Sequence, residues 1–435
     1  MKKTKLSSKF WLALTIFSLV GQIAWVVENM YFNVFIYKMF HASAADISAM
    51  VSASAIAATV TTILIGALSD KIGKRKLFIC GGYILWGISI ASFALVRIDI
   101  IDKMIPLAVS ASSVGISLVI ILDCVMTFFG SSANDACFNA WITDVTDESN
   151  RGAAEGINSM MPLVAILVVF GGFMSFNLDL PKSWTMIFLI IGGCVFLLGL
   201  LGIFLIKDVK IDTSQNKNVF ANIIYGLRPS VIKQNKLLYI TLAAFSVFCI
   251  SIQVFMPYLI LYYEQSLNMS NYVLIMAPAV IIASVITAFY GKRYDKLGFK
   301  AAVTPALSSL MLGYVLLFLF KSTVFVFAGS LFMMTGYLSG MAVFGAMIRD
   351  YTPKNRSGMF QGLRIISQVL IPGIVGPWIG ALVLSDAKKV VNNDGTTSFI
   401  PNQDIFSAAL VVAFVIWLIL AVIFKLTKKD KEEVA

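Results

Sequence analysis

The feature that most constrains this chain is a series of twelve apolar runs, each long enough to cross a bilayer, which takes about 20 helical residues. The runs cover residues 10–37, 46–69, 77–97, 115–143, 153–178, 184–206, 237–263, 271–291, 301–320, 323–348, 358–384 and 404–426. Of the 435 residues, 59% are hydrophobic and 13% are charged, whereas soluble domains carry about a quarter charged residues. The chain is therefore predicted to be an all-α membrane protein with twelve transmembrane helices, and an ordinary soluble enzyme is excluded.

The basic residues predict the orientation of these helices. The chain carries 34 Lys and Arg against 23 Asp and Glu, a formal net charge of +11. If the N-terminus is cytoplasmic, 27 of the 34 basic residues fall in inner segments and 7 in outer ones. This asymmetry follows the positive-inside rule. We therefore expect both termini in the cytoplasm and a bacterial-type plasma membrane location, and we do not expect a nucleic-acid partner.

The two halves of the chain repeat one another. Gly66–Arg75, after the second run, and Gly291–Lys300, after the eighth, both read G-x-x-x-D-K-x-G-x-[RK] at an offset of 225. The loops after the fourth and tenth runs also correspond, through Asp144 to Arg151 and Asp350 to Arg356. Repeats of this kind indicate a duplicated unit. The predicted organisation is a six-helix bundle at 1–206, a polar cytoplasmic linker at 207–236, and a second six-helix bundle at 237–435.

These paired loops resemble the signature loop of the major facilitator superfamily, and the resemblance extends over essentially the whole chain. It implies two pseudo-symmetric six-helix bundles related by an axis along the membrane normal, with a substrate bound between them near the midplane. The resemblance also implies a cytoplasmic gate. We assign to this gate Gly66, Asp70, Gly73, Arg75, Arg151, Asp295 and Arg356.

The chemistry of the first loop supports the gate assignment. Gly66 and Gly73 would permit close helix approach and a tight turn. Asp70 can accept from N–H groups at a helix N-terminus, and Arg75 can bridge to a carboxylate. The alternative is a structural turn with ordinary positive-inside charges, and we prefer that alternative for Lys74 and Lys76.

Three acids fall inside predicted helices, and such residues are functional candidates because a charge in the bilayer is costly. They are Glu28, Asp123 and Asp135. On the first helix, one face of the 3.6-residue period combines amides, a carboxylate and an indole, which suits a sugar. That face holds Gln22, Trp25, Glu28, Asn29, Phe32 and Asn33. The alternative for this face is a helix interface held by buried amides.

Asp135 and Asn139 share one face of the fourth helix and stand at a second point of resemblance. The stretch from Asp135 through Trp141 to the Thr/Asp-rich loop and Arg151 is similar to the glycoside–pentoside–hexuronide cation symporters, the melibiose permease group, and to the related sucrose–proton symporters. The resemblance implies that Asp135 holds sugar hydroxyls. The chain departs from that group at helix 5, which lacks the early basic residue, and at helix 2, which lacks the paired acids of a sodium site.

Two further charged residues each leave two interpretations open. Asp123 is a coupling group, or it lies near the outer surface bonded to Thr127. Arg364 reaches the cavity and pairs with Asp135, or it extends to the cytoplasm, as long basic side chains do. Gln253 and Tyr258 on the seventh helix are weaker substrate-binding candidates. The coupling assignment therefore includes Glu28, Asp123, Asp135 and Arg364.

The predicted function is secondary active transport of a sugar or similar polyhydroxylated solute by alternating access, through proton-coupled symport. The alternative is a drug or metabolite–proton antiporter of the same superfamily, and a membrane enzyme is disfavoured because no catalytic motif stands in any loop. The five cysteines and the single histidine form no metal or disulfide pattern. We expect no cofactor and no metal, a proton gradient as the driving force with sodium as an open alternative, and a monomer in the lipid bilayer.

Overall fold

The structure, a computed structural model, describes residues 6–104, 110–147, 150–208, 226, 228–352, 362–392 and 396–434. Among these residues, twelve helices are long and apolar enough to cross a membrane, which confirms the predicted number of spans. The chain forms two compact units, Met1–Val219 and Phe220–Ala435. Most of the predicted linker at 207–236 lies outside the described residues.

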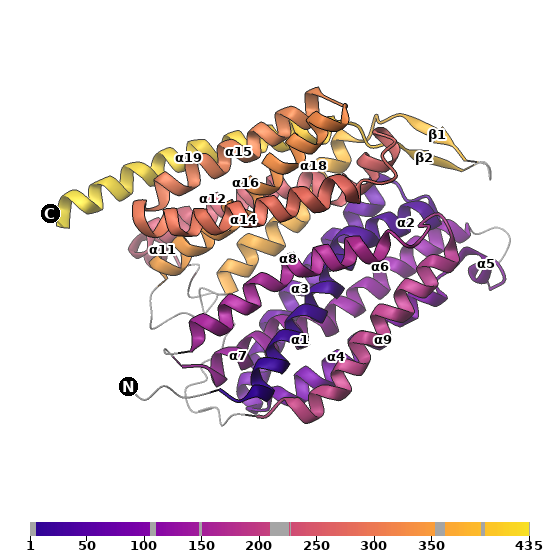
Figure 1. Ribbon diagram of the computed structural model, residues 1–435, viewed down its shortest axis with the longest axis horizontal. Helices are drawn as coiled ribbons and strands as arrows, with labels where there is room; N and C mark the ends of the chain where they lie inside the picture. Colours follow the sequence, from indigo (N-terminus) through magenta and orange to yellow (C-terminus); the bar gives the residue numbers. More distant parts are fainter. Residues whose placement is uncertain are drawn as a thin grey trace. The chain divides into compact units, whose positions relative to one another are not determined.

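The N-terminal unit, coloured from indigo to magenta in Figure 1, contains six spans with bounds close to those predicted. Two of them contain a π-helical segment within their length. The first span consists of α1 (Ser8–Val26), a π-helical turn at Val27–Tyr31 and α2 (Phe32–Phe40). The fourth span consists of α6 (Ala111–Gly130), a π-helical segment at Ser131–Phe138 and α7 (Asn139–Val145). The others are α3 (Ala44–Ile72), α4 (Arg75–Ser92) with a 3₁₀ turn at Phe93–Leu95, α8 (Arg151–Phe173) and α9 (Pro181–Leu205), with the short α5 (Ile98–Ile101) outside the spans.

The C-terminal unit, coloured from magenta to yellow in Figure 1, contains the other six spans. It begins with the short α11 (Pro229–Gln234). Its seventh span joins α12 (Lys236–Phe255), a 3₁₀ turn at Met256–Tyr258, α13 (Leu259–Leu261) and a π-helical turn at Tyr262–Ser266. The remaining elements are α14 (Val273–Leu297), α15 (Phe299–Leu319), α16 (Thr323–Tyr351), a π-helical turn at Ile366–Leu370, α18 (Ile371–Val383), β1 (Lys389–Val391), β2 (Thr397–Phe399) and α19 (Asp404–Val434).

The small β-hairpin is a departure from the all-α prediction. Figure 1 shows β1 and β2 between α18 and α19, and they pair antiparallel with Lys389 opposite Phe399. The segment combines β-branched residues with an aromatic one, a composition that favours strands. Phe399 is buried, and its ring lies 6.3 Å from the ring of Tyr258. The hairpin therefore packs on the seventh span of its own unit.

Proline accounts for the irregularity of the eleventh span. A proline has no N–H to donate to the carbonyl four residues earlier. Pro372 therefore leaves the carbonyl of Gln368 without that helical bond, and the π-helical turn at Ile366–Leu370 ends just before this proline. The π-helical turns of the first and fourth spans contain no proline, and each of them contains one of the three intramembrane acids.

Glycines permit a close helix contact in the N-terminal unit, between α4 and α9. A Cβ added to Gly87 would lie 2.4 Å from the backbone nitrogen of Phe196, and one added to Gly192 would lie 2.6 Å from that of Ala91. Such distances are far shorter than van der Waals contact. Small residues let membrane helices approach closely in this way. The same arrangement recurs between α15 and α16, where a Cβ on Gly336 would lie 2.4 Å from the nitrogen of Leu310.

We expect Gly87→Ala to destabilise the N-terminal unit, because the added methyl group would push α4 away from the backbone of α9. Overpacking of this kind costs about 1–3 kcal/mol. Gly193→Ala is the matched control, since a Cβ at Gly193 meets no atom within 4 Å. Thermal midpoints of the purified variants in detergent measure the effect. Equal midpoints for the two alanine variants would contradict this account of the contact.

Candidate functional site

The three intramembrane acids all belong to the N-terminal unit, but their environments differ. Glu28 lies in the first π-helical turn, Asp123 in α6 and Asp135 in the second π-helical segment. The exposed fractions of Glu28 and Asp123 are 7% and 1%, whereas Asp135 is partly exposed. π-Helical turns inside α-helices are frequent at functional sites. Asp135 therefore has the most exposed side chain of the three acids, and the other two are enclosed.

Glu28 is held by two hydroxyl groups from neighbouring helices. Ser54 on α3 donates to Oε1 of Glu28 at 2.6 Å, and Thr127 on α6 donates to the same oxygen at 2.9 Å. The two hydroxyl oxygens lie 2.9 Å from each other. Oε2 of Glu28 is buried and has no hydrogen-bond partner among the described residues. The carboxylate is thus solvated by hydroxyls on one oxygen and unsolvated on the other.

Asp123 lies close enough to Glu28 for their charges to interact. Its Oδ1 is buried and has no hydrogen-bond partner among the described residues. The predicted alternative, a bond between Asp123 and Thr127, does not form, because the Thr127 hydroxyl donates to Glu28 instead. Asp123 therefore belongs to the same buried cluster as Glu28. Ser54 and Thr127 were not among the residues assigned to the site from sequence, and their only sequence signal is a hydroxyl within an apolar run.

Asp135 accepts hydrogen bonds from its own π-helical segment. Ser131 Oγ donates to Oδ2 at 3.1 Å, and Asn134 Nδ2 lies 3.4 Å from Oδ1. The indole of Trp25 is close to this carboxylate but completes no hydrogen bond to it. Because Asp135 is partly exposed and these contacts leave acceptor capacity on its oxygens, it can accept further hydrogen bonds from a ligand.

Tyr83 on α4 contacts the π-helical segment at Ser131–Phe138 through Asn134. Its hydroxyl lies 3.0 Å from Oδ1 of Asn134 and 3.1 Å from the carbonyl oxygen of Phe17. Asn134 in turn contacts Asp135. Tyr83 is fully buried, so it positions the segment without contacting a solute itself.

The predicted face of the first span divides into an exposed and a buried part. Asn29 is exposed, and its amide donates to the carbonyl of Trp25 at 2.7 Å. Gln22 and Trp25 are half-buried, and the Trp25 ring lies 5.0 Å from that of Trp86. Asn33 is fully buried and donates to the carbonyl of Asn29 at 3.0 Å. The interface interpretation therefore suits Asn33, whereas Gln22, Trp25 and Asn29 remain open to a ligand.

A chain of amides connects the fourth span to two other helices. Asn139 is exposed, and its side chain accepts from Nδ2 of Asn158 on α8 at 3.3 Å. Ser18 on α1 donates to Oδ1 of Asn158 at 2.6 Å. Asn158 was not assigned to the site from sequence. These three side chains form a neutral hydrogen-bonding network between the first, fourth and fifth spans.

The C-terminal candidates have contrasting environments. Tyr258 is fully buried, and its hydroxyl donates to the carbonyl of Pro377 at 3.2 Å, which favours a packing role. Gln253 is half-buried. Arg364 is also half-buried, and its Nε donates to Oε1 of Gln368, one turn further from the inner end, at 3.3 Å. Its guanidinium therefore lies along its own helix toward Gln368, and the two interpretations of Arg364 stay predictions.

Arg75 is the centre of the N-terminal loop cluster. It forms ion pairs with Asp70 and with Asp144, the latter at 3.0 Å, and it also donates to the hydroxyl of Ser69. Arg75 is 5% exposed. The cluster thus joins the end of α3, the start of α4 and the end of α7. Asp70 pairs with this arginine rather than with the N–H groups of a helix N-terminus.

The two loop glycines have different roles. Gly73 ends α3 at φ 70°, in the left-handed region where glycine carries no Cβ penalty. A Cβ added to Gly66 would meet no atom within 4 Å, so the expected close helix approach at Gly66 is not present in the N-terminal unit. Of the two glycines, only Gly73 has a structural role here, because it forms the turn that ends α3.

The remaining loop candidates show that the repeat is not exact. Arg151 donates to the carbonyls of Thr143 and Thr146 and so closes the loop before α8. Asp295 is exposed and forms no ion pair within the part of the chain that the structure describes. Tyr294 stands where Ser69 stands in the first half, and it donates to Asp350 at 2.5 Å. Arg356 lies outside the described residues.

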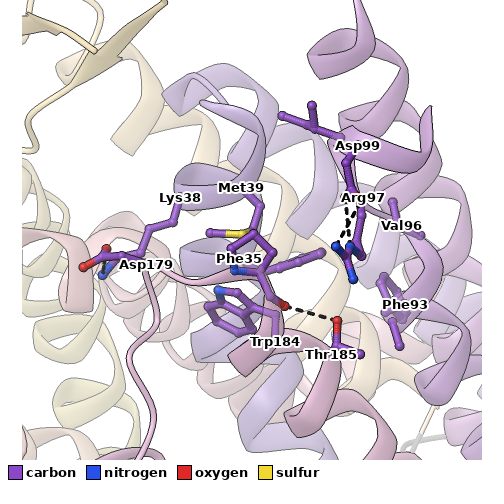
Figure 2. A pocket seen from close by; sticks show the side chains of 13 residues that line it. Phe35, Lys38, Met39, Phe93, Val96, Arg97, Asp99, Asp179, Trp184 and Thr185 are labelled. Carbon is purple, nitrogen blue, oxygen red and sulfur yellow. Dashed lines mark hydrogen bonds and ion pairs between the residues drawn. The ribbon is translucent and has the colours of Figure 1, made fainter. Parts of the chain in front are cut away.

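A separate pocket of about 520 Å³ lies at the other end of the N-terminal unit and contains none of the predicted site residues. Figure 2 shows Lys38 beside Asp179, and Arg97 bonded to Asp99. The Lys38–Asp179 distance is 3.0 Å, and Arg97 donates twice to Asp99 at 2.9 Å, which holds the pKa of that carboxyl below its usual range. These charges satisfy one another, so we assign no ligand to this pocket.

Three solved transporter structures share the fold of this chain over nearly its whole length. The nucleoside transporter NupG gives a TM-score of 0.70 at 14% identity, covering 94% of this chain and 99% of that one. A bacterial homolog of the human lysosomal transporter Spinster, inward-facing and occupied, gives 0.68 at 17% identity, covering 97% of each chain. The xylose transporter XylE from E. coli, partially occluded and inward open, gives 0.67 at 14% identity, covering 95% and 98%.

Comparison with family models and curated sequences gives the classification. No curated protein sequence matched. The family model of the Major Facilitator Superfamily matches residues 10–377, most of the chain. The twelve spans and the two compact units agree with this match. The chain is therefore a transporter rather than an enzyme, and it belongs to the Major Facilitator Superfamily.

Proposed function

We propose that this protein is a secondary transporter that moves a sugar or a similar polyhydroxylated solute together with protons. The observation that carries the proposal is the partly exposed carboxylate of Asp135, set in a π-helical segment beside the Trp25 indole. A carboxylate accepts hydrogen bonds from two hydroxyl groups at once, and hydrogen bonds to a charged acceptor are the strong ones. An indole beside it offers an apolar surface to the C–H face of a sugar ring.

Polar side chains on the helix faces that carry Trp25 and Asp135 suit the same class of solute. Gln22, Asn29 and Asn139 are at least partly exposed amides, and each supplies donors and acceptors for hydroxyl groups. The similarity of the Asp135–Trp141 stretch to the melibiose permease group supports a sugar. The solved relatives include proteins described as nucleoside and xylose transporters, and both solutes carry several hydroxyl groups. A cavity selective for apolar drugs would not need this concentration of amides and carboxylate.

Uptake by proteoliposomes tests the proposal. The purified protein is reconstituted, and labelled sugars and nucleosides are offered with an imposed proton gradient, without one, and with a protonophore. We expect at least one of these solutes to accumulate against its concentration, and the protonophore to abolish that accumulation. Empty liposomes are the control. If no solute of the panel enters, and an apolar cation is instead expelled in exchange for protons, the antiporter alternative replaces this proposal.

A further inference from the structure

We propose that Glu28 and Asp123 form a single proton-binding site, distinct from Asp135, that takes up and releases one proton as a unit. The inference rests on the proposed function for its role in coupling. It identifies which of the intramembrane acids holds the coupling ion and leaves Asp135 to the solute. In the loaded state a proton from the water on one side of the membrane forms an O–H bond on the pair, and it leaves to water on the other side.

The unpartnered oxygens are the first argument. Oε2 of Glu28 and Oδ1 of Asp123 are both buried and lack a hydrogen-bond partner among the described residues. Burial of a charged group without a compensating partner is so costly that the group normally becomes neutral instead. A proton on the pair removes one of the two charges, and it adds an O–H donor where two acceptors stand without one.

The second argument is the like charge of the two groups. Asp123 lies one helical turn before Thr127 on α6, and the Thr127 hydroxyl donates to Glu28 at 2.9 Å. The two buried carboxyl groups therefore stand in the same region and act on one another electrostatically, and a nearby like charge disfavours ionisation of both. When two groups interact this strongly, protons leave in steps that belong to the pair rather than to either residue. A single exchangeable proton shared by the pair is the expected consequence.

Among the described residues of the N-terminal unit, the surroundings offer the pair no cation in place of the proton. The titratable groups that face it are Asp135 on the second π-helical segment and Cys124 on α6, and Tyr83 on α4 faces Asp135. The groups of α3 and α6 that contact Glu28 are the hydroxyls of Ser54 and Thr127. The charged residues of α3, α4, α8 and α9 stand near the helix ends, at Asp46, Asp70, Lys71, Arg75, Lys76, Arg151, Glu155 and Lys182.

The hydrogen bonds also indicate how the pair divides its charge. Two hydroxyls donate to Oε1 of Glu28, and such donors stabilise the ionised form of a carboxyl group. No hydrogen bond to Asp123 is formed by its own helix neighbour Thr127. The remaining negative charge therefore resides on Glu28, and Asp123 carries the proton.

Infrared difference spectroscopy of the purified full-length protein, recorded against pH without any solute, tests this directly. We expect one protonated-carboxyl band that disappears in a single pH step. Asp123→Asn should abolish the band, and Glu28→Gln should move the midpoint of the step by about one pH unit or more, the size of coupling at which titrations merge. Asp102→Asn, in an exposed loop, should leave both the band and its midpoint unchanged.

Two further arms keep the test decisive if a charge-removing variant fails to fold. Thr127→Val and Ser54→Ala keep both acids and remove one donor to Glu28 each, and both are expected to shift the midpoint. Replacing choline with sodium at constant pH is expected to change nothing. A midpoint unaffected by Glu28→Gln, a band that survives Asp123→Asn, or a band removed by sodium would each overturn the proposal. Because no solute is present, these outcomes are independent of whether sugars are transported.

Discussion

Asp135→Asn is expected to weaken solute binding by roughly 10- to 100-fold, because a hydrogen bond to a charged group contributes about 1.5–3 kcal/mol. The asparagine keeps the size of the side chain, but it replaces one acceptor oxygen with a donor and removes the negative charge. Ser131, which donates to Oδ2 of Asp135 at 3.1 Å, would face that donor in one of the two amide orientations. A solute that donates two hydroxyl hydrogen bonds to this carboxylate would then lose at least one of those hydrogen bonds.

Binding and transport together measure this effect. Protection of the purified protein against heat by the solute identified in the uptake panel gives the affinity, and proteoliposome uptake gives the rate. Asp102→Asn makes the same carboxylate-to-amide change at an exposed loop position and should leave both unchanged. Asp135→Glu tests position rather than charge, since the longer side chain moves the carboxylate. Wild-type affinity in Asp135→Asn would show that the solute does not contact this residue.

Much of the fold could be predicted from sequence, for a physical reason. Each membrane-spanning helix must satisfy its own backbone hydrogen bonds in lipid, so each leaves a long apolar run. The basic residues between the runs independently predict which side of the membrane each loop occupies. These signals are local, and the observed twelfth span at Asp404–Leu426 coincides with the predicted one at 404–426. The hairpin at Lys389–Phe399 was missed because it lies in a loop between two spans, where neither an apolar run nor basic residues predict strands.

The site could be predicted only in part, because its geometry depends on how several helices are rotated about their axes. A buried acid in an apolar run is visible in sequence, so Glu28, Asp123 and Asp135 were identified. The π-helical turns at Val27–Tyr31 and Ser131–Phe138 shift the 3.6-residue period on which face assignments depend. The partners of Glu28 come from two other helices, at Ser54 and Thr127, and no spacing within one helix could reveal that contact.

Arg75→Ala is expected to destabilise the inner end of the N-terminal unit by about 1–3 kcal/mol. Removing one partner of a buried ion pair costs more than that, about 3–5 kcal/mol, because a charge remains unpaired. The cost is smaller here because the carboxylates left behind are partly hydrated, with side chains of Asp70 and Asp144 that are 35% and 24% exposed. Three helix ends, those of α3, α4 and α7, would lose their common partner.

A lysine at position 75 should not restore the cluster. Arg75→Lys keeps the positive charge but loses the guanidinium geometry, so it separates the two contributions. Arg75 uses Nε for Asp144, Nη2 for Asp70 and Nη1 for Ser69, whereas a lysine ammonium is a point charge without this planar fork. Arg75→Lys is therefore expected to recover less than half of the stability lost in Arg75→Ala. Lys74→Ala is the matched control, because Lys74 is exposed and adjacent.

Thiol labelling reports the local opening that this loss should produce. Cys137 is fully buried and lies beside the Ser69 hydroxyl, within the reach of the Arg75 charge. In a variant that keeps Cys137 as its only cysteine, a maleimide should react several-fold faster after Arg75→Ala than before, and no faster after Lys74→Ala. Unchanged labelling together with an unchanged thermal midpoint would mean that the ion pairs contribute nothing to closing this end of the bundle. Faster labelling with an unchanged midpoint would instead locate their effect in local opening, the behaviour expected of a gate, because a gate must open without unfolding the helices that carry it.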